Sequence, residues 1–212
     1  MIRNFKEIIK RIKEMNLPYT QFVQFMEDIH DPFIVLIACI LSLRTNDRTT
    51  YPATMRMLEL GKTPKDFLKV KLEDLEKAIY PVGFYKNKAK QILDIASELY
   101  YNYNSIVPKD IDELTKFKGV GRKTANLVQS KGYNLPSICV DVHVHRISNR
   151  LGIVSTNEPE ETEFALKENL PKELWSDINT LFVTLGQNVC KPTKPNCDVC
   201  KLQKYCNFYK SK

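Results

Sequence analysis

Apolar side chains recur along most of the chain with the spacing of an α-helix. Two clear series are Leu72, Leu75, Ala78, Ile79 and Ala89, Ile92, Ala96, Leu99. Steps of three and four residues place side chains on one face of a helix, and that face packs against a core. The pattern predicts a mostly α-helical protein.

The predicted helices are separated by residues that begin and end helices. Proline, which is tolerated in a first helical turn, follows Thr63, Val107 and Glu158, and Gly61 and Gly132 stand near expected helix ends. We therefore expect short loops. The sequence shows no internal repeat, low-complexity tract or long linker.

One segment does not follow helical spacing. Between positions 138 and 145, Ile138, Val140, Val142 and Val144 alternate with Cys139, Asp141, His143 and His145. Strict alternation of apolar and polar residues is typical of a β-strand. Taken alone, this segment predicts a strand.

Composition and charge narrow the class of protein. The 212 residues are 43% hydrophobic, which is enough for one large domain or two lobes of about 100 residues each. The net charge of +7 favours a polyanionic partner, with nucleic acid as the first candidate and an anionic membrane as the second. The longest apolar stretch, Phe33 to Leu41, is far shorter than the roughly 20 residues that span a bilayer. We expect no membrane segment.

The N-terminal segment and the cysteines bear on the compartment. Residues 1–15 are basic, but Glu7 and Glu14 interrupt them and no signal-peptide pattern follows, so an ordinary helix is predicted. Cys39 and Cys139 stand among apolar residues and are predicted to be buried thiols. A reducing cytoplasm therefore fits better than secretion with a disulfide scaffold.

The other four cysteines crowd into residues 190–206 and predict a metal site. They are Cys190, Cys197, Cys200 and Cys206, with the spacing Cys-x6-Cys-x2-Cys-x5-Cys. Four soft thiolates indicate a soft metal. Structural zinc sites usually pair two short cysteine knuckles, and only one such pair occurs here, so a 4Fe-4S cluster is favoured while zinc stays an alternative. Lys191, Lys194, Lys201 and Lys204 surround the cysteines. Some would balance the cluster's charge of roughly −2, and the rest, with Lys191 and Lys194 foremost, would face phosphates.

Residues 110–131 predict a helix, a tight turn and a second helix. Gly119 and Gly121 permit positive φ and close backbone approach, so amide groups at the start of the second helix can point at a phosphate. Lys118 precedes the glycines, and Arg122 and Lys123 follow them. An ordinary helix–helix turn is the alternative.

Lys123 is either a phosphate contact or a nucleophile. A nucleophile must be neutral, whereas an ordinary lysine with a pKa of about 10.4 is neutral in about one molecule in 2,500 at pH 7. Lowering that pKa by about 3 takes roughly 4 kcal/mol, and a helix N-terminus supplies only about 0.3 to 1 kcal/mol. Desolvation in a closed cleft would have to supply most of it.

Three motifs in this order resemble one family. They are the hairpin at residues 114–125, the Val140-Asp141-Val142-His143 segment and the four-cysteine loop. Together they resemble the endonuclease III family of helix-hairpin-helix DNA glycosylases and abasic-site lyases, over a region from about Leu36 to Cys206.

The resemblance implies an all-α fold of two lobes. One lobe is a six-helix barrel at 22–133, which carries the helix-hairpin-helix motif at 110–131. Residues 1–21 and 134–212 form the other, with a 4Fe-4S cluster loop at 190–206. The Val-Asp-x-His stretch would open a helix rather than a strand, with Asp141 as its N-cap.

The resemblance also implies a reaction. Lys123 matches the family's nucleophile and Asp141 its essential carboxylate, and His143 would help shape the pocket. The partner is double-stranded DNA with damaged bases, oxidised pyrimidines first, or abasic sites, bound by a monomer. The base would flip out, Lys123 would attack C1′, and the Schiff base would lead to β-elimination and cleavage on the 3′ side.

The sequence departs from the family pattern at three places. Phe117 and Lys118 stand where Leu-Pro is usual, Arg44 aligns with a usual glutamine that fills the gap left by the flipped nucleotide, and Phe84 replaces leucine in the second wedge loop. Arg44 would hydrogen-bond the orphan base, which leaves the opposite-base preference open. Phe84 would either stack between bases or pack in the core.

Other functions stay open at this stage. A specialised glycosylase for mismatched thymine or oxidised guanine would carry the same motifs. An electron carrier would not need so much helical scaffold, and a silent DNA-binding sensor of cluster oxidation would not need Lys123 with Asp141. His143 and His145 are expected to pack and hydrogen-bond on a helix face. Tyr100, Tyr101 and Tyr103 are left between a base-stacking platform and a core edge.

Overall fold

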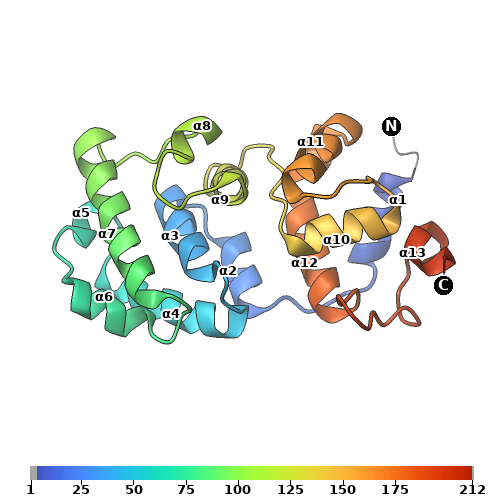
Figure 1. The fold of residues 1–212 in the computed structure, drawn as a ribbon, viewed down its shortest axis with the longest axis horizontal. Helices are drawn as coiled ribbons and strands as arrows, with labels where there is room; N and C mark the ends of the chain where they lie inside the picture. The colour runs from blue at the N-terminus through green and yellow to red at the C-terminus, as the bar shows by residue number, and fades with distance from the viewer. Residues whose placement is uncertain (1–3, 212) are drawn as a thin grey trace. The chain divides into compact units, whose positions relative to one another are not determined.

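The computed structural model describes residues 4–211, and within them it contains helices and no strand (Figure 1). The all-α fold class is confirmed. Of the expected helix boundaries, Pro64 and Pro159 are the first residues of their helices and Gly61 caps the end of another. No helix within 4–211 is long and apolar enough to cross a membrane.

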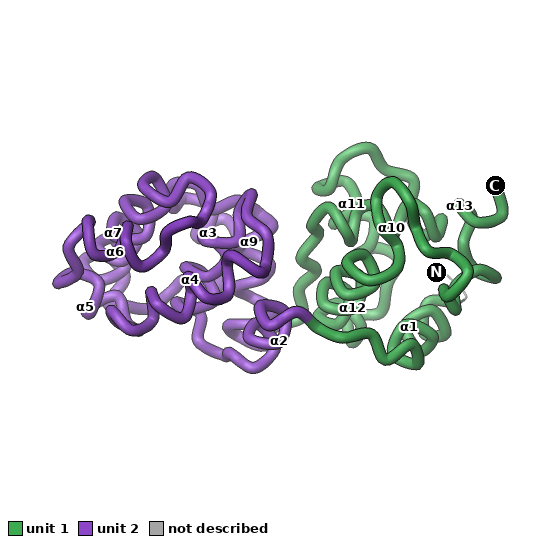
Figure 2. The backbone as a smooth tube through the Cα atoms, turned by 90° about the horizontal axis from the view of Figure 1, so that it is seen from below, with its two compact units in different colours: residues 1–19, 136–212 green, residues 20–135 purple. Residues whose placement is uncertain are grey.

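The chain forms two compact units (Figure 2). Unit 2 is residues 20–135, and unit 1 combines residues 1–19 with 136–212. The division into domains at 22–133 and at 1–21 with 134–212 stays a prediction, since compactness does not show that each part folds separately.

Unit 2 is built around one helix that is apolar on all sides. Its helices are α2 (Gln21–Asp28), α3 (Pro32–Ser42), α4 (Asp47–Leu60), α5 (Pro64–Phe67), α6 (Leu72–Ile79), α7 (Tyr85–Asn102), α8 (Ile111–Leu114) and α9 (Arg122–Leu127), which a π-helical turn at Val128–Gly132 continues. Every residue of the apolar stretch Phe33 to Leu41 is buried in α3. A helix without a polar face must be surrounded by others. Asp31 starts α3 by accepting from the amide of Ile34 at 2.9 Å.

The two helical series read from the sequence face this core. Ala89, Ile92, Ala96 and Leu99 of α7 have no exposed surface, and neither have Leu75 and Ile79 of α6. Leu72, the first residue of α6, lies at the surface instead. Cys39 is buried in the same core.

Unit 1 has a second core with α10 at its centre. Its helices are α1 (Phe5–Lys13), α10 (Val142–Leu151), α11 (Pro159–Asn169), α12 (Trp175–Asn188) and α13 (Asn207–Lys210), with 3-10 turns at Lys172–Leu174 and Gln203–Tyr205. The α10 helix contacts α11, α12 and α13, and α1 packs on α12, where Phe5 meets Phe182. The basic N-terminal segment is thus a helix from Phe5 onward, as expected. Cys139 is buried here.

Candidate active site and metal centre

The hairpin joins α8 and α9 as the sequence predicts. Asp110 caps α8 by accepting from the amides of Asp112 and Glu113 at 2.9 and 3.1 Å. Phe117 is buried and its ring lies 5.4 Å from that of Tyr103, so it anchors the turn in the core. Without the usual proline, the turn is held by this aromatic contact.

The protein's own structure requires glycine at one of the two turn positions and not at the other. Gly119 has φ +76°, and an added Cβ would lie 2.6 Å from Nε2 of Gln91, which donates to the Lys118 carbonyl at 2.7 Å. Gly121 has φ −101°, so only Gly119 uses the positive φ that both glycines permit. An added Cβ at Gly121 would meet no protein atom within 4 Å. Nothing in the described structure therefore requires glycine at position 121.

Lys123 lies in the first turn of α9 and is exposed, with Thr124 and Ala125 buried behind it. The charge of Lys123 acts on the thiol of Cys39 on α3 and lowers its pKa. Burial raises the pKa of that thiol to about 12, and the opposing effect of Lys123 does not overcome it. The Cys39 thiol near Lys123 is therefore neutral. The desolvation expected of a closed cleft is not supplied by burial of the lysine itself.

Asp141 is the N-cap of α10. Its Oδ1 accepts from the amides of His143 at 2.9 Å and Val144 at 2.8 Å. The alternating segment therefore opens a helix, as the resemblance implied, and the cap role is confirmed. The alternation alone predicted a strand, and that prediction is wrong. Two backbone amides donate hydrogen bonds to the Asp141 carboxylate, and these bonds start the helix at Val142. Lys123 belongs to unit 2 and Asp141 to unit 1.

The histidines of α10 pack and hydrogen-bond, as expected. Nδ1 of His143 lies 3.1 Å from NH2 of Arg146, and a Cβ added at Gly186 on α12 would come within 2.2 Å of that nitrogen. His145 contacts the Thr162 hydroxyl at 2.7 Å. His143, the second residue of α10, is thus held tightly against α12.

All four C-terminal cysteines line one cavity of unit 1, of about 320 Å³ including its open mouth. None of them forms a disulfide. Burial raises the pKa of the Cys200 and Cys206 thiols, and charge on the neighbouring cysteines adds to this effect. Four thiolates gathered in this way are stabilised only by a positive centre.

Two arginines of α10 hold the cysteine loop. Arg150 donates to the carbonyls of Lys191 at 2.8 Å and Pro192 at 2.6 Å, and its NH1 lies 3.3 Å from Sγ of Cys190. Arg146 donates to the Cys190 carbonyl at 2.9 Å. The helix that Asp141 begins therefore also carries the side chains that support the cysteine loop.

The donor set fits an iron-sulfur cluster. All four thiols border the same cavity, which brings together the four soft donors that such a cluster needs. A zinc ion holds each sulfur at about 2.3 Å, whereas in a multi-iron cluster the thiolates bind different irons and lie farther apart.

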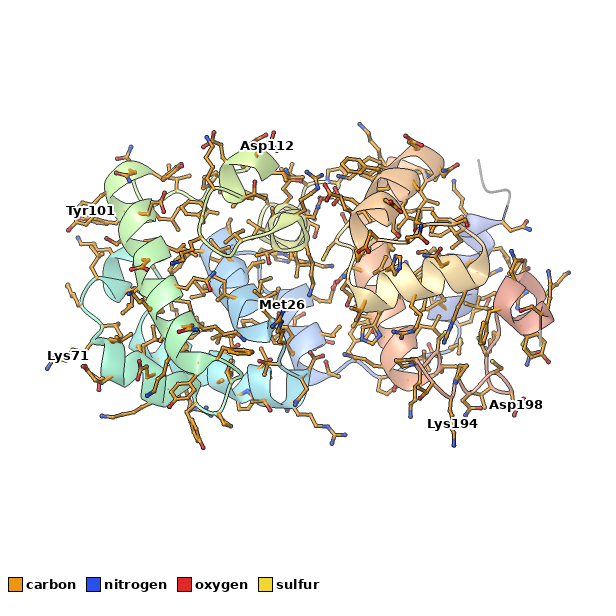
Figure 3. The ribbon with its side chains drawn as sticks, in the orientation of Figure 1. Met26, Lys71, Tyr101, Asp112, Lys194 and Asp198 are labelled. Carbon is orange, nitrogen blue, oxygen red and sulfur yellow. The ribbon has the colours of Figure 1, made fainter. Side chains whose placement is uncertain are left out.

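The lysines of the cysteine loop divide into two groups. Lys191 and Lys194 are exposed, and the side chain of Lys194 extends outward (Figure 3). Lys201 instead donates to the Glu14 carbonyl at 2.8 Å and ties the loop to the residue that ends α1. Lys204 is exposed as well.

Arg44 and Phe84 occupy the tips of two loops of unit 2. Both are exposed, and both have positive φ, +53° and +58°. Phe84 is 63% exposed, so the alternative that it packs in the core is wrong. The loops are bonded to each other, because the Gly83 amide donates to the Thr45 hydroxyl at 3.2 Å. Of the three tyrosines left unassigned, Tyr101 points outward (Figure 3), whereas Tyr103 packs on Phe117.

Comparison with known proteins decides the family. Residues 37–172 match the model of the HhH-GPD superfamily of base excision DNA repair proteins. Endonuclease III of Thermotoga maritima is 48% identical over 180 residues, which are 85% of this chain and 84% of that protein. The chain belongs to the endonuclease III family.

Solved structures of endonuclease III agree with this assignment. A structure of a non-covalent endonuclease III–DNA complex has a TM-score of 0.86 and 35% identity, covering 99% of this chain and 96% of the other. A trapped endonuclease III–DNA covalent intermediate has a TM-score of 0.81 and 36% identity, covering 100% and 99%. As an endonuclease III family member, the protein is a bifunctional DNA glycosylase and abasic-site lyase of base excision repair.

Sequence reasoning missed three basic residues of this endonuclease III family member. Arg146 and Arg150 are four apart on the helix that Asp141 opens, which is a readable signal for one shared face. Lys88 is buried, and it falls on the apolar stripe of α7 just before Ala89 and Ile92. A charged residue on an apolar stripe is the signal that would have found it.

Proposed function

We propose that this protein releases a damaged base, with oxidised pyrimidines as the first class, from double-stranded DNA and then cuts the strand through a Schiff base on Lys123. The observation that carries the proposal is the position of Lys123. It is exposed in the first turn of α9, directly after a turn where a side chain at Gly121 would meet no protein atom. Glycine there leaves the backbone open to an approaching phosphate, and it is also a favoured N-cap residue for α9.

The DNA would be bound by amides and cations of both units. In unit 2 these are the turn at Gly119 and Gly121 with Lys118 and Arg122. In unit 1 they are Lys191 and Lys194 on the cysteine loop. Phosphate contacts of this kind position the duplex without reading its sequence. Because the substrate is the DNA of the cell, we expect the protein to act inside the cell. We also expect it to bind DNA as a monomer.

The reaction would proceed in three steps: release of the base, formation of the imine and β-elimination. The neutral amine of Lys123 forms a bond to C1′ while the C1′–N bond to the base breaks, and the departing base takes up a proton. The amine nitrogen then loses a proton, and O4′ takes one up as the C1′–O4′ bond breaks, which opens the sugar ring and gives the protonated imine. A base then removes the acidified C2′ proton, and the C3′–O bond breaks with the 3′ phosphate as leaving group. Bound DNA would supply the desolvation that burial does not.

Asp141 would act at the first step. A carboxylate at the start of α10 stabilises positive charge that develops on the sugar as the base leaves, and it accepts a proton from the attacking amine. The two amides that bond Oδ1 hold its orientation. His143, packed against α12, would border the pocket for the flipped base.

The first test is made on the unmodified protein. We expect it to nick duplexes that contain thymine glycol or an abasic site, and borohydride to trap one covalent protein–DNA adduct. A duplex panel with oxidised guanine and mismatched thymine measures the lesion preference that Arg44 leaves open. Release of bases without a trapped adduct would contradict the lysine mechanism.

We propose that Cys190, Cys197, Cys200 and Cys206 hold a 4Fe-4S cluster. The cluster, when bound, would supply a fixed centre that joins the loop at 190–206 to α10 through Arg146 and Arg150. Its part in DNA binding follows from the same loop, because Lys191 and Lys194 project from it. The proposed role is that of a clamp on a basic loop.

Substitution of Cys200 by serine tests the clamp. We expect less iron and sulfide per chain, a thermal midpoint lower by roughly 5–10 °C, which corresponds to a loss of about 3 kcal/mol in a chain of this size, and weaker DNA binding. Cys139→Ser, which changes a buried thiol outside the loop, is the control for iron content. Zinc in place of iron, or unchanged folding and affinity after cluster loss, would contradict the proposal.

Phe84 is proposed to enter the base stack. Because it is exposed, Phe84→Ala should leave stability unchanged while weakening binding to an abasic-site duplex about 10-fold, through loss of roughly 1–2 kcal/mol of stacking. Tyr101→Ala is the matched control, since Tyr101 is an exposed aromatic residue of the same unit. Equal losses in the two variants, measured by fluorescence anisotropy, would rule out a special role for Phe84.

A further inference from the structure

Lys88 is a buried cation beside two loops, which we call the wedge loops: residues 43–46, which carry Arg44, and residues 80–84, which carry Phe84. It lies in the first turn of α7 and is only 5% exposed. Its Nζ lies 2.9 Å from the Leu41 carbonyl, 2.5 Å from the Leu43 carbonyl and 3.2 Å from the Thr45 hydroxyl. Three acceptors match the three donors of an ammonium group.

The helix dipole and burial both disfavour a charged lysine at this position. The first turn of a helix is the positive end of its dipole, and burial lowers the pKa of Lys88 to about 8. Taking a charge out of water costs several kcal/mol, which only good hydrogen-bond partners offset. The compensation comes from α3, which ends at Ser42 and exposes its last carbonyls to the Lys88 ammonium.

The acceptors identify what Lys88 holds. Leu43 and Thr45 are the direct neighbours of Arg44, whose φ of +53° is unfavourable for a residue with a Cβ. The Thr45 hydroxyl also accepts from the Gly83 amide, next to Phe84. Phe84, four residues before Lys88, has its own carbonyl bonded to the Lys88 amide at 3.1 Å. The Lys88 side chain therefore joins the helix that Phe84 begins to the backbone that presents Arg44, and the Thr45 hydroxyl links both to Gly83.

We propose that Lys88 is a positioning residue that locks the Arg44 and Phe84 loops into one preformed edge for insertion beside the flipped nucleotide. The inference rests on the proposed function of these two side chains. It adds that insertion depends on a polar lock in the protein interior, and that loss of the lock lets Arg44 leave its left-handed conformation. Preformed loops lower the cost of ordering on binding.

The test compares Lys88→Met with Lys90→Met, an exposed lysine two positions along the same helix. The probe is a duplex with a tetrahydrofuran abasic analogue and 2-aminopurine opposite it. We expect Lys88→Met to bind about 10-fold more weakly and to lose most of the fluorescence rise that reports unstacking. The borohydride-trapping rate on natural abasic DNA at saturating enzyme should stay within about 3-fold of the unmodified protein. Lys90→Met should match the unmodified protein.

A mutant cycle excludes a merely structural role. Because Lys88 acts through the wedge loops, Lys88→Met in a Phe84→Ala background should weaken binding by less than about 2-fold further. Full additivity, or unaltered binding and fluorescence in Lys88→Met, would overturn the proposal. If Lys88→Met does not fold, Thr45→Val decides instead: about 3-fold weaker binding with a reduced fluorescence rise supports the lock, and no change overturns it. Failure of the unmodified protein to trap abasic DNA would contradict the proposed function, not the lock.

Discussion

Lys123→Gln should abolish strand cleavage and borohydride trapping, with the single-turnover rate on abasic DNA lower by a factor on the order of 10⁴ or more. Glutamine keeps the length and polarity of the side chain but has no amine to form an imine. Since Lys123 is exposed, the fold should not change. Denaturing gels of nicked duplex, with and without borohydride, measure both effects.

Binding must be separated from chemistry in this experiment. Affinity for an uncleavable abasic analogue should fall only a few-fold, because the variant loses one positive charge and the cations proposed to contact phosphates are retained. Lys90→Gln, an exposed lysine on α7, controls for net charge. Strand scission by Lys123→Gln at the rate of the unmodified protein would remove Lys123 from the reaction.

Asp141→Asn should lower base release from a thymine-glycol duplex by roughly 10²- to 10³-fold, as expected when a stabilising charge is removed from a developing cation. Asparagine caps helices as well as aspartate does. The two bonds to the amides of His143 and Val144 are therefore retained, and the thermal midpoint should change little. The rate of base release under single turnover is the measurement.

A second substitution at the same position separates the cap from the charge. Asp141→Ala removes both and should cost about 1 kcal/mol of stability in addition to activity. An asparagine variant with full activity would show that Asp141 serves only as the cap. Equal loss of stability in both variants would show that the capping argument fails.

Features set by short stretches of chain are those that the sequence by itself determined. The helical class follows from apolar spacing, and the apolar stretch Phe33 to Leu41 is too short to predict a membrane segment. The hairpin at 110–131 follows from its glycines and flanking apolar residues. These depend on the chain's own backbone and on neighbours a few positions away, so a local pattern carries them. Where local patterns conflicted, at 138–145, the resemblance and not the alternation predicted the helix that Asp141 caps.

Only the tertiary structure decided how distant residues meet. Lys88 reaches a carbonyl 47 positions away, and Arg150 reaches Sγ of Cys190 40 positions away. The sequence marks Lys88 and Arg150 themselves, but it does not show which residues they meet, because that depends on packing of helices that the spacing alone does not orient. The exposure of Phe84 and the extended φ of Gly121 were decided in the same way. Sequence spacing thus predicted which chemistry the chain carries, while packing decided which side chains hold that chemistry in place.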